Sequence, residues 1–126
     1  MMKPKYHFLA NAKFALEGVL AMLKQEVAFR IELAIIIPAV IISFFLPLDL
    51  IEHLFLIVVL FLILILEAVN SSIESCIDLI TPNFHPLAKI AKDCASAAVF
   101  FSVLLALLVW GVILFSLWNS LEDIKS

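Results

Sequence analysis

Residues 54–66 read LFLIVVLFLILIL, and residues 67–78 continue as EAVNSSIESCID. The first stretch is wholly apolar, and the second adds carboxylates, an amide and serines without any proline or glycine to end a helix. A helix needs about 20 mostly apolar residues to cross a bilayer core of roughly 30 Å. We therefore predict a membrane-spanning helix over about 51–80, with polar side chains in its second half.

Two further stretches are apolar enough to cross a membrane. Between Leu33 and Leu48 the one polar side chain is Ser43, and Ala95–Trp118 has no charge. We predict spans over about 28–47 and 94–118, joined by a tight turn near Asp49 and by a connection over 81–93. The chain is 65% hydrophobic, with a mean hydropathy of +1.20, which is far above a soluble domain. Its 126 residues predict a single all-α, integral membrane domain over 1–126.

Residues 6–24 show an amphipathic pattern ahead of the first span. Apolar side chains fall on one side of a helix drawn at 100° per residue, and charged side chains lie beside them. The apolar set is Leu9, Ala12, Leu16, Val19, Leu20 and Leu23, and the charged set is Lys13, Glu17 and Lys24. We predict a surface helix over about 6–24, which would either lie on the membrane or cover the neck of a helix bundle.

Basic residues set the predicted orientation. They gather before or at the start of the first span and in the second connection, whereas the turn near Asp49 has none. The residues are Lys3, Lys5, Lys13, Lys24, Arg30, Lys89 and Lys92. The positive-inside rule then places the N-terminus and the second connection in the cytoplasm. The net charge of −3 and the lack of a basic stripe argue against a nucleic-acid partner.

The polar half of the second span forms one stripe. At 100° per residue its members fall within about 100° of one another; they are Glu67, Asn70, Ser71, Glu74 and Asp78. A carboxylate at membrane depth costs roughly 2.5–3.5 kcal/mol, so such a stripe indicates a bound cation or a group that transfers a proton. The alternative, helix-end residues reaching into the headgroups, stays open for Asp78.

Other polar residues fall at the level of this stripe. Glu26 precedes the first span, and with Glu74 and water it would suit Mg²⁺, which binds through one or two carboxylates plus phosphate oxygens. Lys92 can act as a point charge on phosphate. Arg30 can be a positive-inside anchor or a ligand contact, and the spacing alone favours a loop role for His7 and His85.

Three motifs resemble those of the prokaryotic diacylglycerol kinase family, which also contains undecaprenol kinases. The stripe matches its E-x-x-N-S-x-I-E-x-x-x-D signature. Residues 85–93, HPLAKIAKD, resemble its H-x-L…A-K-D segment, and residues 26–32, EVAFRIE, resemble its E-x-A-F-R-x-E segment. The motifs occur in the family's order and cover nearly the whole chain.

The resemblance implies a homotrimeric lipid kinase of the bacterial cytoplasmic membrane with active sites between subunits. It would use ATP and magnesium (Mg²⁺) to convert diacylglycerol to phosphatidic acid. Glu67 would be the catalytic base, and Glu26 and Glu74 would hold the metal. The implied nucleotide contacts are His7, Phe14, Glu26, Asn70, Glu74, Asn83, His85, Lys92 and Asp93. The implied lipid contacts are Arg30, Glu32, Glu67, Ser96 and Trp110.

Two departures leave the lipid open. His7 stands where the diacylglycerol branch often has Arg. Residues 89–93 are closer to the undecaprenol branch, whereas residues 28–30 and 96–99 look more like the diacylglycerol branch. Undecaprenol is therefore the alternative substrate.

Two non-kinase readings also remain. An ion- or proton-coupled transporter would account for the acidic stripe, but Leu54–Leu66 offers no polar residue to line a water path. A non-enzymatic membrane subunit could pack through the stripe, and it would not bind ATP.

Overall fold

The computed structural model describes residues 7–126, which form four helices and no strand. They are α1 (Phe8–Gln25), α2 (Val27–Ser43), α3 (Leu50–Ile80) and α4 (Pro86–Lys125). The predicted all-α class is confirmed. Tyr6, where the surface helix was expected to start, lies outside the described residues, as do Lys3 and Lys5.

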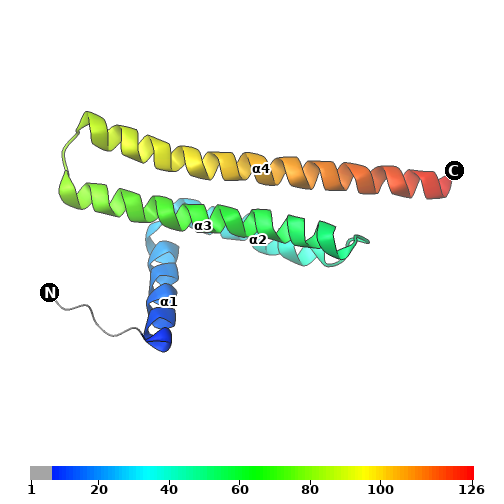
Figure 1. Cartoon of the computed structure of the whole chain (residues 1–126), viewed down its shortest axis with the longest axis horizontal. Coiled ribbons are helices and arrows are strands. Elements are labelled where there is room, and N and C mark those ends of the chain that lie inside the picture. Colours follow the sequence, from blue (N-terminus) through cyan, green and yellow to red (C-terminus); the bar gives the residue numbers. More distant parts are fainter. Residues whose placement is uncertain (1–6) are drawn as a thin grey trace.

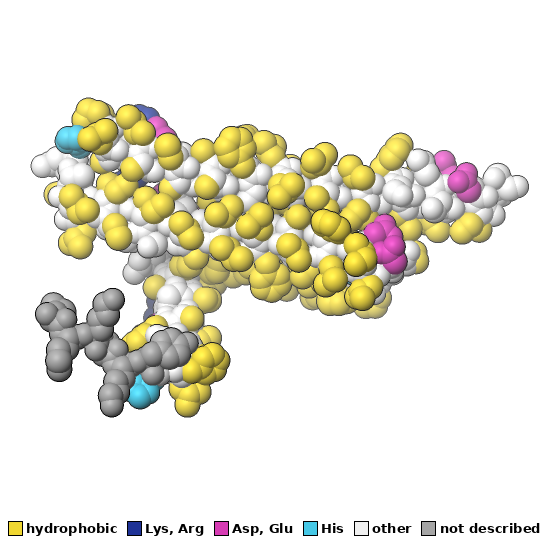
Figure 2. Space-filling view, in the orientation of Figure 1, with side chains coloured by type: hydrophobic (Ala, Val, Ile, Leu, Met, Phe, Trp, Pro, Cys, Tyr) yellow, Lys and Arg dark blue, Asp and Glu magenta, His cyan; other side chains and the backbone are white. Residues whose placement is uncertain are grey.

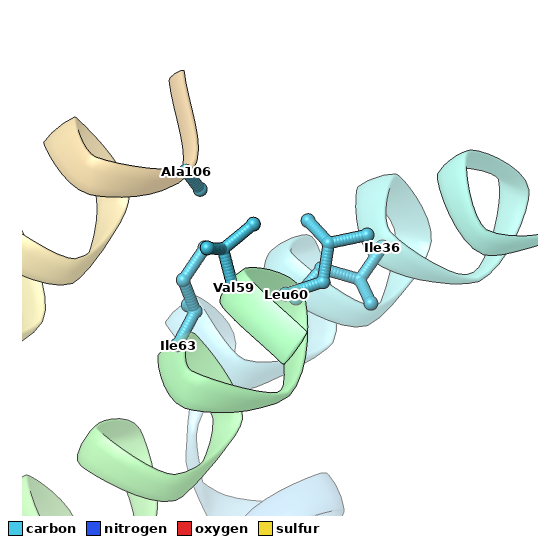
Figure 3. Packing of buried hydrophobic residues seen from close by; sticks show 5 residues of the cluster. All are labelled: Ile36, Val59, Leu60, Ile63 and Ala106. Atoms are coloured by element: carbon cyan, nitrogen blue, oxygen red, sulfur yellow. The ribbon is translucent and has the colours of Figure 1, made fainter. Parts of the chain in front are cut away.

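Helices α2, α3 and α4 form a bundle in which α3 is central. Figure 1 shows α3 and α4 running side by side along the length of the molecule, with α2 behind α3. A small apolar core joins the three helices where they meet (Figure 3). It consists of Ile36 of α2, Val59, Leu60 and Ile63 of α3, and Ala106 of α4. Beside it the Trp110 indole Nε1 donates to the carbonyl oxygen of Leu56 at 3.1 Å.

The outer surface of the bundle is apolar. Large hydrophobic side chains are exposed on every helix, and Figure 2 shows them covering the visible face between charged groups near the ends. Both α3 and α4 are long and apolar enough to cross a membrane. Helix α2 has 17 residues, so at about 1.5 Å per residue it covers roughly 25 Å. Three spans were predicted. The first of them along the chain, which corresponds to α2, stays a prediction.

Local signals explain where α3 and α4 begin. The Asp49 carboxylate accepts the Glu52 backbone N–H at 2.8 Å, and the Glu52 side chain accepts from Asp49 in return. This capping box satisfies N–H groups that a helix start leaves unpaired. At α4, Pro86 occupies the first turn, and Nδ1 of His85 accepts the Leu87 N–H. Proline is favoured there because its φ is preset for a helix.

The start of α4 corrects the expected connection over 81–93. That connection ends at His85, so Lys89, Lys92 and Asp93 lie on the first turns of α4. The helix also continues past Trp118 to Lys125. The positions of these three residues are therefore fixed by a helix and not by a loop.

Helix α1 runs across the direction of the bundle (Figure 1). It buries no residue, and it turns into α2 at Glu26, whose backbone is extended. Nη1 of Arg30 donates to the carbonyl oxygens of Leu23 at 2.8 Å and Lys24 at 3.2 Å. These are carbonyls that the end of a helix leaves unpaired, so Arg30 fixes the end of α1 against the start of α2.

Candidate functional site at the polar half of α3

The predicted stripe follows the inward side of α3 and becomes exposed toward the end of the helix. Glu67, Asn70 and Ser71 are buried, at 4%, 8% and 8% exposure. Glu74 is half-buried and Asp78 is exposed. The stripe is therefore a polar continuation of the packed face of α3.

Glu67 has an acidic neighbour on α2. Glu32 lies close enough to Glu67 for the two carboxyl groups to interact electrostatically. The second oxygen of Glu32, Oε2, is buried without a partner among the described residues. Sequence reasoning named both residues but did not pair them, because they lie 35 positions apart on different helices. This contact brings two predicted lipid contacts together.

Asn70 and Ser71 leave polar atoms without partners. The Asn70 amide nitrogen Nδ2 donates to Oε1 of Glu74 at 3.2 Å, which orients that carboxylate. Within residues 7–126, however, Asn70 Oδ1 and Ser71 Oγ are buried and make no hydrogen bond. Buried polar groups are nearly always paired in native structures. These atoms therefore indicate a partner that is not part of the described chain.

Glu26 lines a hollow between α1 and α3. Its volume is about 510 Å³, and Ser71, Ser72 and Ser75 form part of its α3 side. Glu74 does not line it, and the part of the chain that the structure describes has no group of three metal-ligating side chains. A set of two carboxylates is still compatible with Mg²⁺, because this ion takes most of its ligands from water and substrate phosphates.

Four of the predicted nucleotide contacts meet at the α3–α4 connection. Asn83, His85, Lys92 and Asp93 line a second hollow of about 360 Å³, together with Asp78 and Lys89. Two ion pairs lie within it, Lys92–Asp78 at 2.5 Å and Lys89–Asp93 at 2.6 Å.

The His85 ring has a defined tautomer at this hollow. Because Nδ1 accepts the Leu87 N–H, the neutral ring carries its proton on Nε2. The start of α4 adds the positive end of a helix dipole. The second hollow therefore combines a ring N–H donor, a helix N-terminus and two ammonium groups, which favour anionic groups, with the Asp78 and Asp93 carboxylates that pair with those ammonium groups.

An apolar groove of about 360 Å³ lies between α2, α3 and α4. Glu32 and Trp110 line it with apolar parts of their side chains, and both were predicted lipid contacts. The other residues of the groove are Ile35, Ile36, Ala39, Leu60, Ile63, Val103, Ala106 and Leu107. Glu67 does not line the groove, but its carboxyl group is close to that of Glu32. The wholly apolar surface of the groove suits an alkyl chain.

The remaining predicted contacts lie apart from these hollows in the described chain. His7 and Phe14 are exposed on or beside α1, Ser96 is exposed on α4, and Arg30 is bonded to carbonyls of α1. Asp78 was predicted as a member of the stripe but not as a nucleotide contact, although its place in the motif and its spacing from Lys92 across the connection pointed to this hollow.

Comparisons with known proteins agree with the motifs. A family model described as prokaryotic diacylglycerol kinase matches residues 13–114. The chain is 36% identical over 109 residues to a diacylglycerol kinase of Haemophilus influenzae, covering 86% of this chain and 92% of that one. It is 36% identical over 105 residues to the diacylglycerol kinase of Escherichia coli K12, covering 83% and 86%.

A diacylglycerol kinase of Helicobacter pylori is 35% identical over 105 residues, which cover 83% of this chain and 82% of that one. These relatives are matched over most of their lengths, and the family model extends from Lys13 in α1 to Leu114 in α4. The resemblance read from the motifs is thereby confirmed: this chain belongs to the prokaryotic diacylglycerol kinase family, and it is a lipid kinase.

Proposed function

We propose that this protein transfers the γ-phosphoryl group of ATP to the hydroxyl of diacylglycerol, giving phosphatidic acid and ADP. The observation that carries the proposal is the buried Glu67 carboxyl group near Glu32, a residue that lines one wall of an apolar groove. A lipid alcohol whose chain lies in that groove would have its hydroxyl next to Glu67. The relatives are diacylglycerol kinases, which favours diacylglycerol as the substrate, and undecaprenol is the alternative lipid.

In this proposal Glu67 is the general base. Its carboxylate accepts the hydroxyl proton while the lipid oxygen bonds to the γ-phosphorus, and the bond from that phosphorus to the β-phosphate oxygen breaks. Phosphoryl transfer depends mainly on positioning and on neutralising charge, so a base within hydrogen-bonding reach of the hydroxyl is the main chemical requirement. Burial of Glu67 keeps bulk water from competing as the acceptor.

The phosphates would lie along the exposed part of the stripe. We assign Glu26 and Glu74 to Mg²⁺, which when bound neutralises charge on the phosphate oxygens. Asn70 keeps the Glu74 carboxylate oriented through its 3.2 Å hydrogen bond. Asn83, His85, Lys92 and Asp93 would contact the nucleotide at the α3–α4 hollow, where the start of α4 also favours anions.

A homotrimer would complete this site. Two features of the single chain support it: the exposed apolar side chains of α1, and the buried atoms of Asn70 and Ser71 that have no partner within residues 7–126. In the trimer, His7 and Phe14 of a neighbouring copy would reach the nucleotide, and Arg30 and Ser96 would face the lipid. The distribution of the basic residues favours a site on the cytoplasmic side of the bacterial inner membrane.

The test is phosphate transfer by the purified full-length protein in detergent micelles and in liposomes. Labelled ATP is supplied with magnesium and with either diacylglycerol or undecaprenol, and the relative from Haemophilus influenzae serves as the positive control. We expect label in phosphatidic acid at a rate at least tenfold above label in undecaprenyl phosphate. Transfer to undecaprenol alone would show that undecaprenol, and not diacylglycerol, is the substrate. Transfer to neither lipid, with an active control, would overturn the proposal.

A further inference from the structure

Asp78 is the one charged member of the stripe to which the proposed chemistry gives no role. Its Oδ1 lies 2.5 Å from Nζ of Lys92. The bond joins the last turn of α3 to the second turn of α4, across the connection that carries Asn83 and His85. The lysine is thus drawn from its own helix toward the stripe.

The other ion pair in the same hollow differs, because both of its residues belong to α4. Lys89 and Asp93 are four residues apart on α4, and their side chains are 62% and 63% exposed. Exposed pairs of this type contribute little to a fold. The Lys92 side chain is 39% exposed and that of Asp78 is 63% exposed, so this pair is also exposed, but its two residues belong to different helices. Of the two ammonium groups in this hollow, Lys92 is therefore the one with a fixed position relative to α3.

That position matters because of where Asp78 lies on α3. It follows Glu74 by four residues, and Glu74 follows Asn70 by four. At 1.5 Å per residue, Asp78 lies about 6 Å along the helix from Glu74, on the same face. An ammonium held on Asp78 is therefore about one helical turn from the carboxylate that we assign to the metal on the nucleotide phosphates.

We propose that Asp78 is a positioning residue that holds the Lys92 ammonium in place for the phosphates of the nucleotide. The inference rests on the proposed function. A lysine has three N–H donors, so one bond to Asp78 leaves two for phosphate oxygens. A free lysine side chain samples many rotamers, and the bond removes that freedom before the nucleotide arrives. Asp78 itself touches no substrate.

The test is steady-state kinetics of the full-length enzyme with ATP and lipid varied separately. Asp78→Asn should raise the KM for ATP roughly tenfold, the size of one lost charge-assisted hydrogen bond, and leave the KM for lipid within about twofold. Asp78→Glu, which keeps the charge, should recover most of this loss. Asp123→Asn, at the far end of α4, is the matched control. In a Lys92→Met background, Asp78→Asn should add nothing, because its effect acts through Lys92.

A second variant tests whether Asp78 positions the Lys92 ammonium group or only joins α3 to α4. The exchanged pair Asp78→Lys with Lys92→Asp restores an ion pair between α3 and α4 but moves the ammonium to α3. We expect it to unfold at the wild-type temperature and to keep the raised KM for ATP. A wild-type KM in the exchanged pair would show that the bond only joins the helices and would overturn the inference.

The remaining outcomes are also decisive. A lowered KM for ATP in Asp78→Asn would mean that Asp78 competes with phosphate for Lys92. An unchanged KM would mean that Asp78 does not affect nucleotide binding. Either result overturns the inference but leaves the proposed kinase activity intact. A wild-type protein that phosphorylates no lipid would remove the proposed function and this inference together.

Discussion

The two halves of α3 bury the same face of the helix, one with apolar side chains and the other with polar ones. In the half that follows Asp49, the buried residues are Leu56, Val59, Leu60 and Ile63; in the other half they are Glu67, Asn70 and Ser71. The spacing of three and four residues continues unbroken from one half to the other. The site is therefore a continuation of the core face, with polar residues in place of apolar ones from Glu67 onward.

The two halves also differ in whether their buried groups are satisfied within the chain. The apolar half packs against α2 and α4 and forms the core. In the polar half, atoms of Asn70 and Ser71 are buried without partners in the described chain. Unpaired buried polar groups reduce stability. We infer that the first half stabilises the bundle, and that the second is kept for what binds there.

The largest expected effect comes from Glu67→Gln. This change keeps the size of the side chain and removes its ability to accept the hydroxyl proton, so phosphate transfer should fall by about 10²–10⁴-fold. The unfolding temperature in micelles should not fall, because the amide buries no charge. The measurement is labelled phosphate transfer alongside thermal unfolding. A variant with wild-type activity would show that Glu67 is not the base. The polar half of α3 would then not be the reactive half.

Leu56→Ala is the matching change in the apolar half and should have the next largest effect. Leu56 is fully buried, so the cavity should lower the free energy of unfolding by about 2–4 kcal/mol. Its backbone carbonyl remains available to Trp110. Thermal unfolding in micelles measures the loss, and kcat per folded enzyme should stay near wild type. Unchanged stability with lost activity would reverse the roles that we assign to the two halves.

Much of this comparison could be predicted from the sequence, because it lies within one helix. Helix α3 begins one residue before the predicted 51 and ends at the predicted 80. The stripe was expected on one face, and the burial of Glu67, Asn70 and Ser71 on the packed side of α3 agrees with that. Apolar runs and helical spacing are local signals, and they were sufficient here.

Features that depend on how helices pack were not predictable in the same way. The contact of Glu32 with Glu67 depends on how α2 is rotated against α3, which the periodicity of either helix does not define. Arg30 was expected to be an anchor or a ligand contact, and its hydrogen bonds to carbonyls of α1 were not foreseen. The start of α4 was placed too late because the charged residues 89–93 were read as a connection, although His85 and Pro86 are a cap and a first-turn proline.

The smallest expected effect comes from Asp49→Ala, at the far end of α3. The substitution removes the carboxylate that accepts the Glu52 N–H at 2.8 Å, and loss of such a cap costs about 1 kcal/mol. The unfolding temperature in micelles should fall slightly, and phosphate transfer should not change, because the cap lies at the end of α3 opposite to the stripe. Asp49→Asn is the matched control, since asparagine caps a helix as well as aspartate does. If Asp49→Ala lowered phosphate transfer while Asp49→Asn did not, the start of α3 would be coupled to the site. The assignment of one half of α3 to stability and the other to reaction would then be wrong.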